Sequence, residues 1–261
     1  MPTLTVGILA RDNEDEIVQC LESVSWADET LVILDTRSTD HTEFAARSLG
    51  ARVVKSEFRH FAQQREVGLA ETTTDWLFFV DSDERGTPEL GEEIRRVIAD
   101  DGYDGWWVPR RNLIFGREVR HGGWYPDYQL RLLRVGRAHY DPAREVHEVV
   151  LLDGPEGYLS CPLWHHNYRT FGQFAAKQRQ YVDLEAGIRL KQGVRPKPWT
   201  YLAQPLREFW RRYVRLKGYR DGWLGLVLAA LIAYYYGFLV TVRLGRLRRA
   251  DARQGRAQAA E

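Results

Sequence analysis

The chain has 261 residues, of which 44% are hydrophobic and 28% are charged. This composition excludes a disordered or fibrous protein, and the length suits one large domain or two small ones. A formal net charge of +1 argues against a dedicated nucleic-acid-binding protein, so no nucleic-acid partner is expected. Two cysteines, Cys20 and Cys161, are too few for a disulfide scaffold.

Short apolar runs alternate with helix signals over the first hundred residues. The runs cover residues 4–9, 30–34, 52–54 and 76–80. They are β-rich and alternate poorly, which is typical of strands covered on both faces. Helices are expected after a cap at Asp12, after a capping box of Asp40 with Glu43, over 61–70, and after Thr87–Pro88. This order predicts an α/β fold with a doubly wound, mostly parallel sheet.

The pattern changes after Asp104. Aromatic or β-branched runs at 105–109, 128–135 and 146–152 lie between glycine-rich turns, and they predict a small antiparallel extension of the sheet. A further helix is expected over 171–190, where helical periodicity returns.

Residues 223–242 contain no charge, and as a helix they would be about 30 Å long, close to the hydrocarbon thickness of a bilayer. Upstream, a predicted helix carries an apolar stripe flanked by arginines, made of Leu202, Leu206, Phe209, Tyr213 and Leu216. Because both flanks of 223–242 are basic, the positive-inside rule gives no orientation. We expect membrane association of 195–261. A monotopic or re-entrant hairpin with both flanks on the cytoplasmic face satisfies the charges better than a simple span, although a span stays open; the alternative is a buried helix of a soluble core.

The near-neutral total conceals two regions of opposite charge. Residues 195–261 hold 14 Lys and Arg against 4 Asp and Glu, a net charge of +10, whereas residues 1–194 carry −9. A basic segment suits anionic lipid headgroups, and an acidic one suits a divalent cation.

The clearest chemical signal is the run WLFFVDSDE, in which a buried strand ends in three carboxylates within four residues. Open parallel sheets bind ligands at the carboxyl ends of their strands. An Asp-x-Asp pair offers hard oxygen ligands to Mg²⁺ or Mn²⁺, which can hold a diphosphate. A solvated acidic turn is the alternative interpretation.

Three segments, RDNEDEI, LDTRSTDHT and WLFFVDSDE, together resemble the nucleotide-sugar half of family 2 glycosyltransferases, which have the GT-A fold. Five further segments are similar to the branch related to lipopolysaccharide-core glucosyltransferases: CLESVSWADE, YDGWWVPRRN, HGGWYPDYQLRLLR, VHE and HHNYRT. The resemblance extends to about Leu190. It covers the C-terminal helices less specifically, and it implies that residues 1–194 form the GT-A catalytic domain; the membrane association expected of 195–261 rests on their hydropathy and charge.

The resemblance also implies roles for individual residues. Asp127, ahead of an LRL stretch, matches the family's catalytic base. Nucleotide-sugar contacts would come from Ala10, Arg11, Glu14, Asp35, Arg65, Asp81 and Ser82. Metal ligands would be Asp83 as the principal one, with Asp81 and His147, and acceptor contacts would come from Trp124, Tyr125 and Glu148. The chain departs from the pattern at Thr36–Arg37 and at Glu66, where an asparagine is commoner.

These roles define a metal-dependent, inverting glycosyltransferase that uses a nucleotide-sugar donor, with a UDP-sugar favoured, and a membrane-bound glycolipid or saccharide acceptor at the cytoplasmic face of the membrane. Direct displacement needs one base near the acceptor hydroxyl and one Lewis acid on the leaving diphosphate. Two other functions stay open: transfer to polyprenyl phosphate, which needs no base, and a non-catalytic membrane adaptor. A homo-oligomer is also left open.

Competing roles for single residues stay open too. Asp127 could simply pair with Arg131 or Arg120, and Glu84 or Glu148 could be the base instead. The histidines at 165 and 166 are interpreted as structural.

Overall fold

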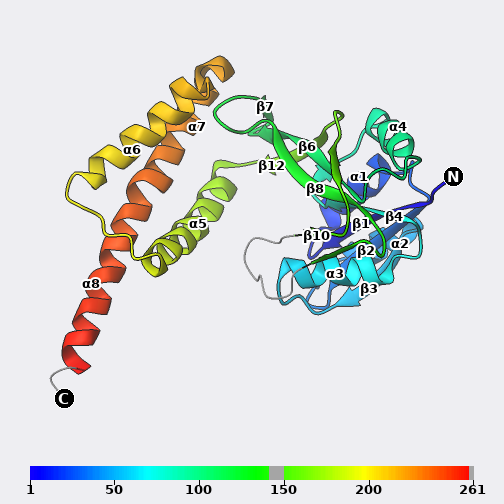
Figure 1. Cartoon of the computed structure of the whole chain (residues 1–261), viewed down its shortest axis with the longest axis horizontal. Coiled ribbons are helices and arrows are strands. Elements are labelled where there is room, and N and C mark those ends of the chain that lie inside the picture. Colours follow the sequence, from blue (N-terminus) through cyan, green and yellow to red (C-terminus); the bar gives the residue numbers. More distant parts are fainter. Residues whose placement is uncertain (141–149, 259–261) are drawn as a thin grey trace. The chain divides into compact units, whose positions relative to one another are not determined.

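The computed structural model describes residues 1–140 and 150–258, with side chains as far as Asp251. The chain forms two compact units (Figure 1). Unit 1 comprises Met1–Arg111 and Pro126–Asn167, and unit 2 comprises Asn112–Tyr125 and Tyr168–Glu261. The predicted functional division at residue 194 stays a prediction; the compact units divide the chain at other residues.

Unit 1 is built on a mixed sheet in the order β3-β2-β1-β4-β8-β6-β12-β5. The strands are β1 (Leu4–Ala10), β2 (Glu29–Asp35), β3 (Arg52–Ser56), β4 (Trp76–Asp81), β5 (Glu84–Arg85), β6 (Gly105–Ile114), β8 (Asp127–Arg134) and β12 (Leu163–Tyr168). The first four are parallel, as predicted, whereas β8 runs antiparallel to β4 and β6 antiparallel to β8.

The sheet is therefore mixed, and the prediction that it is mostly parallel underestimated the number of antiparallel strands. The antiparallel strands do not form a small appendage, because β8 enters the main sheet directly beside β4. Strand β11 (Glu156–Tyr158) adds parallel to β6, and β9 (Ala138–Tyr140) pairs with β10 (Val150–Leu152) as a separate ribbon. Part of the predicted strand at 146–152 lies outside the described residues.

Helices cover both faces of the parallel strands, which explains their poor alternation. One face packs against α1 (Glu14–Ser23), α2 (Thr42–Ser48) and α4 (Pro88–Val97), through a core that includes Val6, Ile17 and Leu90. The other packs against α3 (Phe61–Glu71), where Gly68 allows close approach because a Cβ there would lie 2.9 Å from Phe79.

Two of the predicted helix starts differ in detail. Thr87 caps α4 as expected, accepting from the N–H of Leu90 at 3.2 Å. Asp12, however, has a φ of +48° and accepts from the N–H of Thr39 at 2.8 Å, while Asn13 takes the cap position of α1. Asp40 accepts from the N–H groups of Glu14 and Thr42 and so joins two loops. The acidic residues therefore organise loops at the carboxyl edge of the sheet.

Unit 2 is mainly helical. Its elements are β7 (Arg117–Val119), α5 (Phe171–Lys191), α6 (Thr200–Trp210), a π-helical turn η1 (Arg211–Arg215), a short η2 (Gly218–Asp221), α7 (Gly222–Ile232), a π-helix η3 (Ala233–Leu239) and α8 (Val240–Gln258). Within the described part of the chain, one helical stretch, Gly218–Asp251, is long and apolar enough to cross a membrane. Half of its most apolar window is buried inside the protein.

Candidate active site

Strand order brings the predicted site residues to one edge of the sheet. Strands β1, β2 and β4 are parallel, so their carboxyl ends lie together, and these ends carry Ala10, Asp35 and Asp81. Since β8 runs antiparallel to β4, its first residue, Asp127, lies at this edge too. The register then places Arg110 of β6 opposite Asp127. Residues from five separate strands therefore meet where α/β sheets bind their ligands.

Asp81 is held by two guanidinium groups. Its Oδ2 accepts from Nη2 of Arg131 at 2.6 Å, and its Oδ1 accepts from Nη1 of Arg131 at 3.1 Å and from Nη2 of Arg65 at 3.0 Å. Burial alone would raise the pKa of this carboxyl group, but the charges of Arg131 and Arg65 bring it well below its ordinary value. Arg65 thus lies beside the Asp-x-Asp motif, and its predicted contact with the donor stays a prediction.

Glu84 faces inward and is not exposed at all. Its Oε2 accepts from the N–H of Asp81 at 2.9 Å, and its Oε1 accepts from Nη1 of Arg110 at 3.2 Å. A carboxylate buried in this way cannot reach an acceptor hydroxyl. This burial and the pairing with Arg110 favour Asp127 over Glu84 as the base.

Asp127 is oriented from two sides. Nε and Nη2 of Arg110 both donate to its Oδ2, at 2.9 and 2.6 Å, and the side-chain amide of Gln129 donates to Oδ1 at 2.9 Å. The Asp127 side chain is 30% exposed. Because each carboxylate oxygen has about two lone-pair sites, Oδ1 can accept a further hydrogen bond from an exposed ligand. The pairing partner is Arg110; Arg131 binds Asp81, and Arg120 binds Glu118.

These six side chains form what we call the arginine–carboxylate cluster: Arg65, Arg110, Arg131, Asp81, Glu84 and Asp127. Three guanidinium groups balance three carboxylates. Burial lowers the pKa of Arg110 and Arg131, but the neighbouring carboxylates more than offset it and raise both. Arg110 links β5 to the start of β8, because it contacts both Glu84 and Asp127, and Glu84 in turn accepts from the N–H of Asp81 at the end of β4.

Asp83 has a different neighbour. Its Oδ2 lies 3.4 Å from Nε2 of His165 on β12, and its carbonyl accepts from the N–H of His166 at 2.9 Å. The described residues contain no group of three or more His, Cys, Asp and Glu side chains placed to hold a metal ion. Mg²⁺ and similar ions, however, commonly take one or two protein carboxylates and complete their shell with substrate phosphates and water. Asp83, whose side chain is 30% exposed, offers a carboxylate of this kind.

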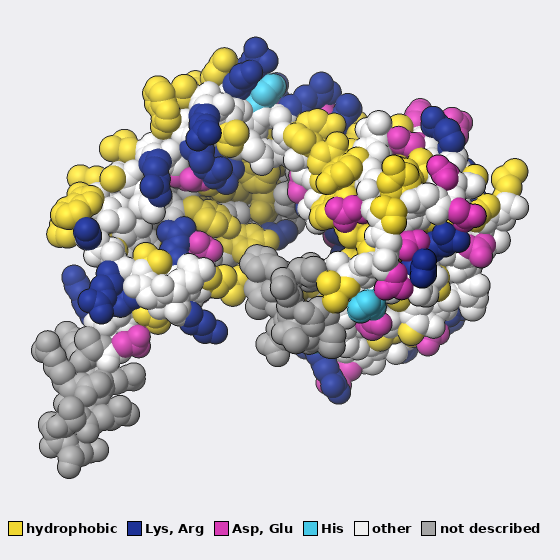
Figure 2. Space-filling view, viewed as in Figure 1, with side chains coloured by type: hydrophobic (Ala, Val, Ile, Leu, Met, Phe, Trp, Pro, Cys, Tyr) yellow, Lys and Arg dark blue, Asp and Glu magenta, His cyan; other side chains and the backbone are white. Residues whose placement is uncertain are grey.

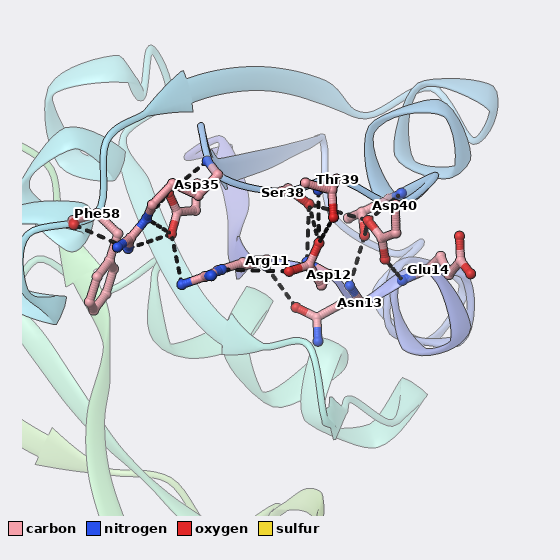
Figure 3. A network of polar contacts seen from close by, with 11 residues as sticks. Arg11, Asp12, Asn13, Glu14, Asp35, Ser38, Thr39, Asp40 and Phe58 are labelled. Atoms are coloured by element: carbon pink, nitrogen blue, oxygen red, sulfur yellow. Dashed lines mark hydrogen bonds and ion pairs between the residues drawn. The ribbon is translucent and has the colours of Figure 1, made fainter.

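Asp35, the predicted nucleotide contact, ends β2 and is only 4% exposed (Figure 3). Arg37 encloses it: Nη2 donates to Oδ2 at 2.8 Å, and the backbone N–H donates to Oδ1 at 3.0 Å. Arg11 approaches the same Oδ2 at 3.7 Å. The Arg37 hydrogen bond lowers the pKa of Asp35 to about 2. Arg37, one of the departures from the family pattern, is thus the direct partner of Asp35.

The loops after β1 and β2 are tied together in the same region (Figure 3). Oε2 of Glu14 accepts from the N–H of His41 at 2.9 Å, and the N–H of Asp12 donates to Ser38 Oγ at 3.0 Å. These bonds leave Arg11 about half exposed at the edge of the sheet. A basic side chain in this position can meet an anionic ligand.

The other predicted site residues are distributed as follows. Ser82 lies between Asp81 and Asp83, and its carbonyl accepts from Arg85 at 2.7 Å. Trp124 and Tyr125 belong to unit 2 and are both partly exposed. In that unit Asn112 donates to the Trp124 carbonyl at 3.0 Å. His147 and Glu148 lie outside the described residues.

Sequence reasoning did not single out Arg110, considered Arg131 only as a partner of Asp127, and interpreted His165 as structural; in the structure Arg131 pairs with Asp81 and His165 lies beside Asp83. Arg131 had a usable signal, because it follows Asp127 by four residues within one strand and so points to the same face. Arg110 and His165 lie on other strands, and only the pairing of β6 with β8 and of β12 with β5 brings them to the site.

Comparison with known proteins places the chain in a family. Residues 5–140 match the sequence model of Glycosyl transferase family 2, which is just over half of the chain. The protein belongs to this family and is a glycosyltransferase.

One relative matches nearly the whole chain. The lipopolysaccharide core biosynthesis glycosyltransferase LpsC of Rhizobium meliloti (strain 1021) is 28% identical over 248 residues, which cover 92% of this chain and 91% of LpsC. An uncharacterized glycosyltransferase of Rickettsia bellii (strain RML369-C) is 22% identical over 94% of this chain and 86% of its own length. The predicted resemblance to enzymes of lipopolysaccharide core synthesis is confirmed.

Among solved structures, glucosyl-3-phosphoglycerate synthase from Mycobacterium tuberculosis, in complex with Mn²⁺, UDP and glucosyl-3-phosphoglycerate, is 19% identical with a TM-score of 0.47. The match covers 77% of this chain and 83% of that one. Residues 1–349 of TarS from S. aureus match with a TM-score of 0.47 at 12% identity, over 97% of this chain and 92% of that one.

Proposed function

We propose that this glycosyltransferase transfers a sugar from a nucleotide-sugar donor, with inversion, to a hydroxyl group of a membrane-bound glycolipid or saccharide of the lipopolysaccharide-core type. The observation that carries the proposal is the Arg110 bridge, which holds Asp127 next to the Asp-x-Asp end of β4. The similarity to LpsC over nearly the whole chain supports the acceptor class.

Asp127 would act as the base. In a direct displacement, the acceptor oxygen attacks the anomeric carbon, the bond from that carbon to the diphosphate oxygen breaks, and the hydroxyl proton passes to a carboxylate. Arg110 and Gln129 fix the direction of the Asp127 carboxylate, and its partial exposure leaves room for the acceptor. Orienting the base in this way lowers the entropy cost of reaching the transition state.

Asp83 and His165 would hold a divalent cation, Mg²⁺ or Mn²⁺, near the donor diphosphate. When bound, the ion supplies positive charge that stabilises the leaving group. Asp81 was predicted as a second ligand, but both of its oxygens accept from arginines, so Asp83 offers the better-placed carboxylate. His147 stays a predicted ligand outside the described residues.

The nucleotide would lie along the ends of β1 and β2. Asp35, Arg11, Ala10 and Glu14 border this region, and Arg65 lies on its β4 side. Because Arg37 occupies both oxygens of Asp35, a ribose or base could bind Asp35 only if Arg37 moved or shared its contacts. A UDP-sugar is the favoured donor, as the sequence predicted.

Because the proposed acceptor is membrane-bound, the protein would work at the cytoplasmic face of the membrane. Trp124, Tyr125 and Glu148 stay predicted acceptor contacts, because the first two immediately precede the Asp127 segment in the chain. The apolar helical stretch and the basic character of unit 2 support association with a lipid surface.

Screening of donor hydrolysis tests the proposal. The full-length protein is incubated with UDP-, GDP- and ADP-sugars, with Mn²⁺ or with chelator, and release of the nucleoside diphosphate is followed. Slow, metal-dependent hydrolysis of one donor is expected, because water can replace the acceptor. A folded protein that neither hydrolyses nor binds any of these donors would contradict the enzyme assignment of the site.

A further inference from the structure

Helix α6 carries a stripe of large apolar side chains that face solvent. The stripe follows the spacing 199, 202, 206 and 210, which places all four side chains on one side of a helix. Trp199 is 64% exposed, Leu202 72%, Leu206 70% and Trp210 63%. No side chain of α6, whose residues are all described, is fully buried. Figure 2 shows hydrophobic side chains over this helix, with Lys and Arg side chains among them.

A second exposed stripe lies on α7 and η3, and consists of Trp223, Leu226, Val227, Tyr234 and Phe238. The opposite face of this helix is committed to the core of unit 2. There Leu224, Leu228 and Ile232 are buried in one cluster with Phe174 and Val182 of α5. The continuous helix of α7 and η3 is therefore apolar on all sides. Burial in the core of unit 2 explains one face, whereas the apolar side chains of the other face are exposed to solvent.

The two stripes belong to one antiparallel hairpin. A side chain at Gly237 of η3 would collide with Pro205 of α6, and one at Gly245 of α8 would collide with Tyr201. The contact pairs run in opposite directions along the chain, so α6 lies along η3 and the start of α8. Glycine at these positions allows the two helix backbones to approach closely.

The charge of unit 2 indicates what this surface meets. Unit 2 holds 21 Lys and Arg against 7 Asp and Glu, whereas unit 1 holds 16 against 29. Exposed arginines at 207, 211 and 215 lie next to the α6 stripe. Leucine and tryptophan beside arginine is the composition of helices that lie in the headgroup region of anionic bilayers. An anionic membrane surface offers both an apolar layer for the exposed stripes and negative charge for the arginines. A protein partner would need a surface that combines the same two properties.

The same packing argues against a transmembrane span. Helix α8 is joined to α5 by an ion pair between Arg243 Nε and Asp183 Oδ1 at 2.7 Å, and Arg248 donates to the Val194 carbonyl at 2.6 Å. If α7 and η3 crossed the bilayer, the helices packed on them would enter it as well. Helix α5 contains Lys177, Arg179, Asp183, Glu185 and Arg189, and charged side chains at the bilayer centre are costly.

We propose that the hairpin of α6 with α7 and η3 lies in the plane of one anionic leaflet, with its exposed stripes in the acyl boundary and its arginines in the headgroups, and does not cross the membrane. This inference rests on the proposed function, in which the protein associates with a membrane, and it specifies that the helices lie in the membrane surface and do not span it. The sequence alone left a span and an interfacial position open.

Vesicle flotation tests the surface. Full-length protein is mixed with phosphatidylcholine vesicles with or without phosphatidylglycerol. The wild type should float with the anionic vesicles, and Leu202→Glu with Leu206→Glu should lower partitioning at least about tenfold, because two leucines no longer enter the acyl boundary. Phe44→Glu with Phe61→Glu is the matched control, since both rings are exposed on unit 1, and it should float like the wild type. Equal binding by the α6 variant would overturn the proposed surface.

Depth measurement tests the orientation. Spin labels are attached to single cysteines made by Leu226→Cys, Ala230→Cys, Tyr234→Cys or Phe238→Cys, in a Cys20→Ala and Cys161→Ser background. An in-plane helix gives similar depths at all four sites. A span gives a steady change of depth along the helix, of about 18 Å over twelve residues, and would overturn the proposal.

Donor hydrolysis on the same samples separates the two proposals. Loss of flotation with hydrolysis intact would remove the membrane association and leave the glycosyltransferase site standing. Flotation with uniform depth but no hydrolysis of any donor would contradict the proposed glycosyltransferase site and leave the membrane association standing.

Discussion

Arg110 and Asp127 face each other across two neighbouring antiparallel strands, and Nε and Nη2 of Arg110 both donate to Oδ2 of Asp127, at 2.9 and 2.6 Å. The third nitrogen of the same guanidinium group donates to Glu84 at 3.2 Å. One planar side chain thus fixes the proposed base relative to the motif that would hold the donor. Only arginine combines a permanent charge with donors in this rigid arrangement.

Asp127→Asn should abolish transfer while leaving the fold and the donor site intact. The amide keeps the shape of the carboxylate but cannot take the acceptor proton, so turnover should fall about 10²- to 10⁴-fold. Transfer from a radiolabelled donor to a glycolipid acceptor measures the loss, and titration with UDP and Mn²⁺ should give an unchanged affinity. Transfer to the glycolipid that survives the substitution would contradict Asp127 as the base. If the acceptor is instead polyprenyl phosphate, transfer to that phosphate should be insensitive to Asp127→Asn, because its acceptor oxygen is already anionic.

Arg110→Gln should destabilise the protein strongly. Arg110 is 15% exposed and pairs with two carboxylates, one of them fully buried, so its loss leaves uncompensated negative charge in the interior. Breaking a buried pair in this way costs about 3–5 kcal/mol in the free energy of unfolding.

Urea unfolding followed by circular dichroism measures this change. Arg120→Gln provides the control, because Arg120 forms a solvent-exposed pair with Glu118 and should change the free energy of unfolding by less than about 1 kcal/mol. Equal effects of the two substitutions would mean that Arg110 does not bridge Glu84 and Asp127 in solution.

Asp83→Asn should weaken nucleotide binding only when a divalent cation is present. The amide is a poorer ligand for a hard cation, so the affinity for UDP with Mn²⁺ should fall at least about tenfold, to the level seen with chelator. Calorimetric titration checks this, with Asp101→Asn as the control because Asp101 is 93% exposed. A metal-dependent affinity that survives Asp83→Asn would remove Asp83 from the metal site.

The pairing of Asp35 with Arg37 should stabilise the protein at neutral pH, and this contribution to the free energy of unfolding should be lost in acid. The pKa of Asp35 is lowered to about 2 in the folded state, chiefly by the hydrogen bond from Arg37, against an ordinary value of 3.8. The contribution to stability is therefore fully present above about pH 4 and is lost as the pH falls through 2. Because Arg37 is 49% exposed, we expect about 1 kcal/mol rather than the full linkage value of about 2 kcal/mol.

The measurement is the free energy of unfolding at pH 6 and at pH 3 for the wild type and for Asp35→Asn. The difference between the two proteins should shrink at the lower pH, since the wild-type carboxylate begins to protonate once the chain unfolds. A constant difference would show that Arg37 does not hold Asp35 in solution.

Local patterns predicted much of this architecture. The four parallel strands, helix α3, the Thr87 cap and helix α5 lie where hydrophobic runs and capping residues place them. Motif order identified the family, which the sequence comparison confirmed. The cap at Asp12 was predicted wrongly because its carboxylate binds the backbone of another loop, and Asp40, although it accepts from the first N–H of α2, also binds the N–H of Glu14; such distant partners leave no local signal.

By itself, the sequence determined the α/β class, the acidic end of β4 and the family, because each depends on residues that are neighbours in the chain. Tertiary structure decided which charges meet. Arg110 reaches Asp127 and Glu84, 17 and 26 residues away, because β6, β8 and β5 join one sheet. It also decided that α7 and η3 bury one face against α5 and expose the other, which composition cannot distinguish. Hydrophobic periodicity is a local property, whereas ion pairing and burial depend on strand register and helix packing between distant parts of the chain.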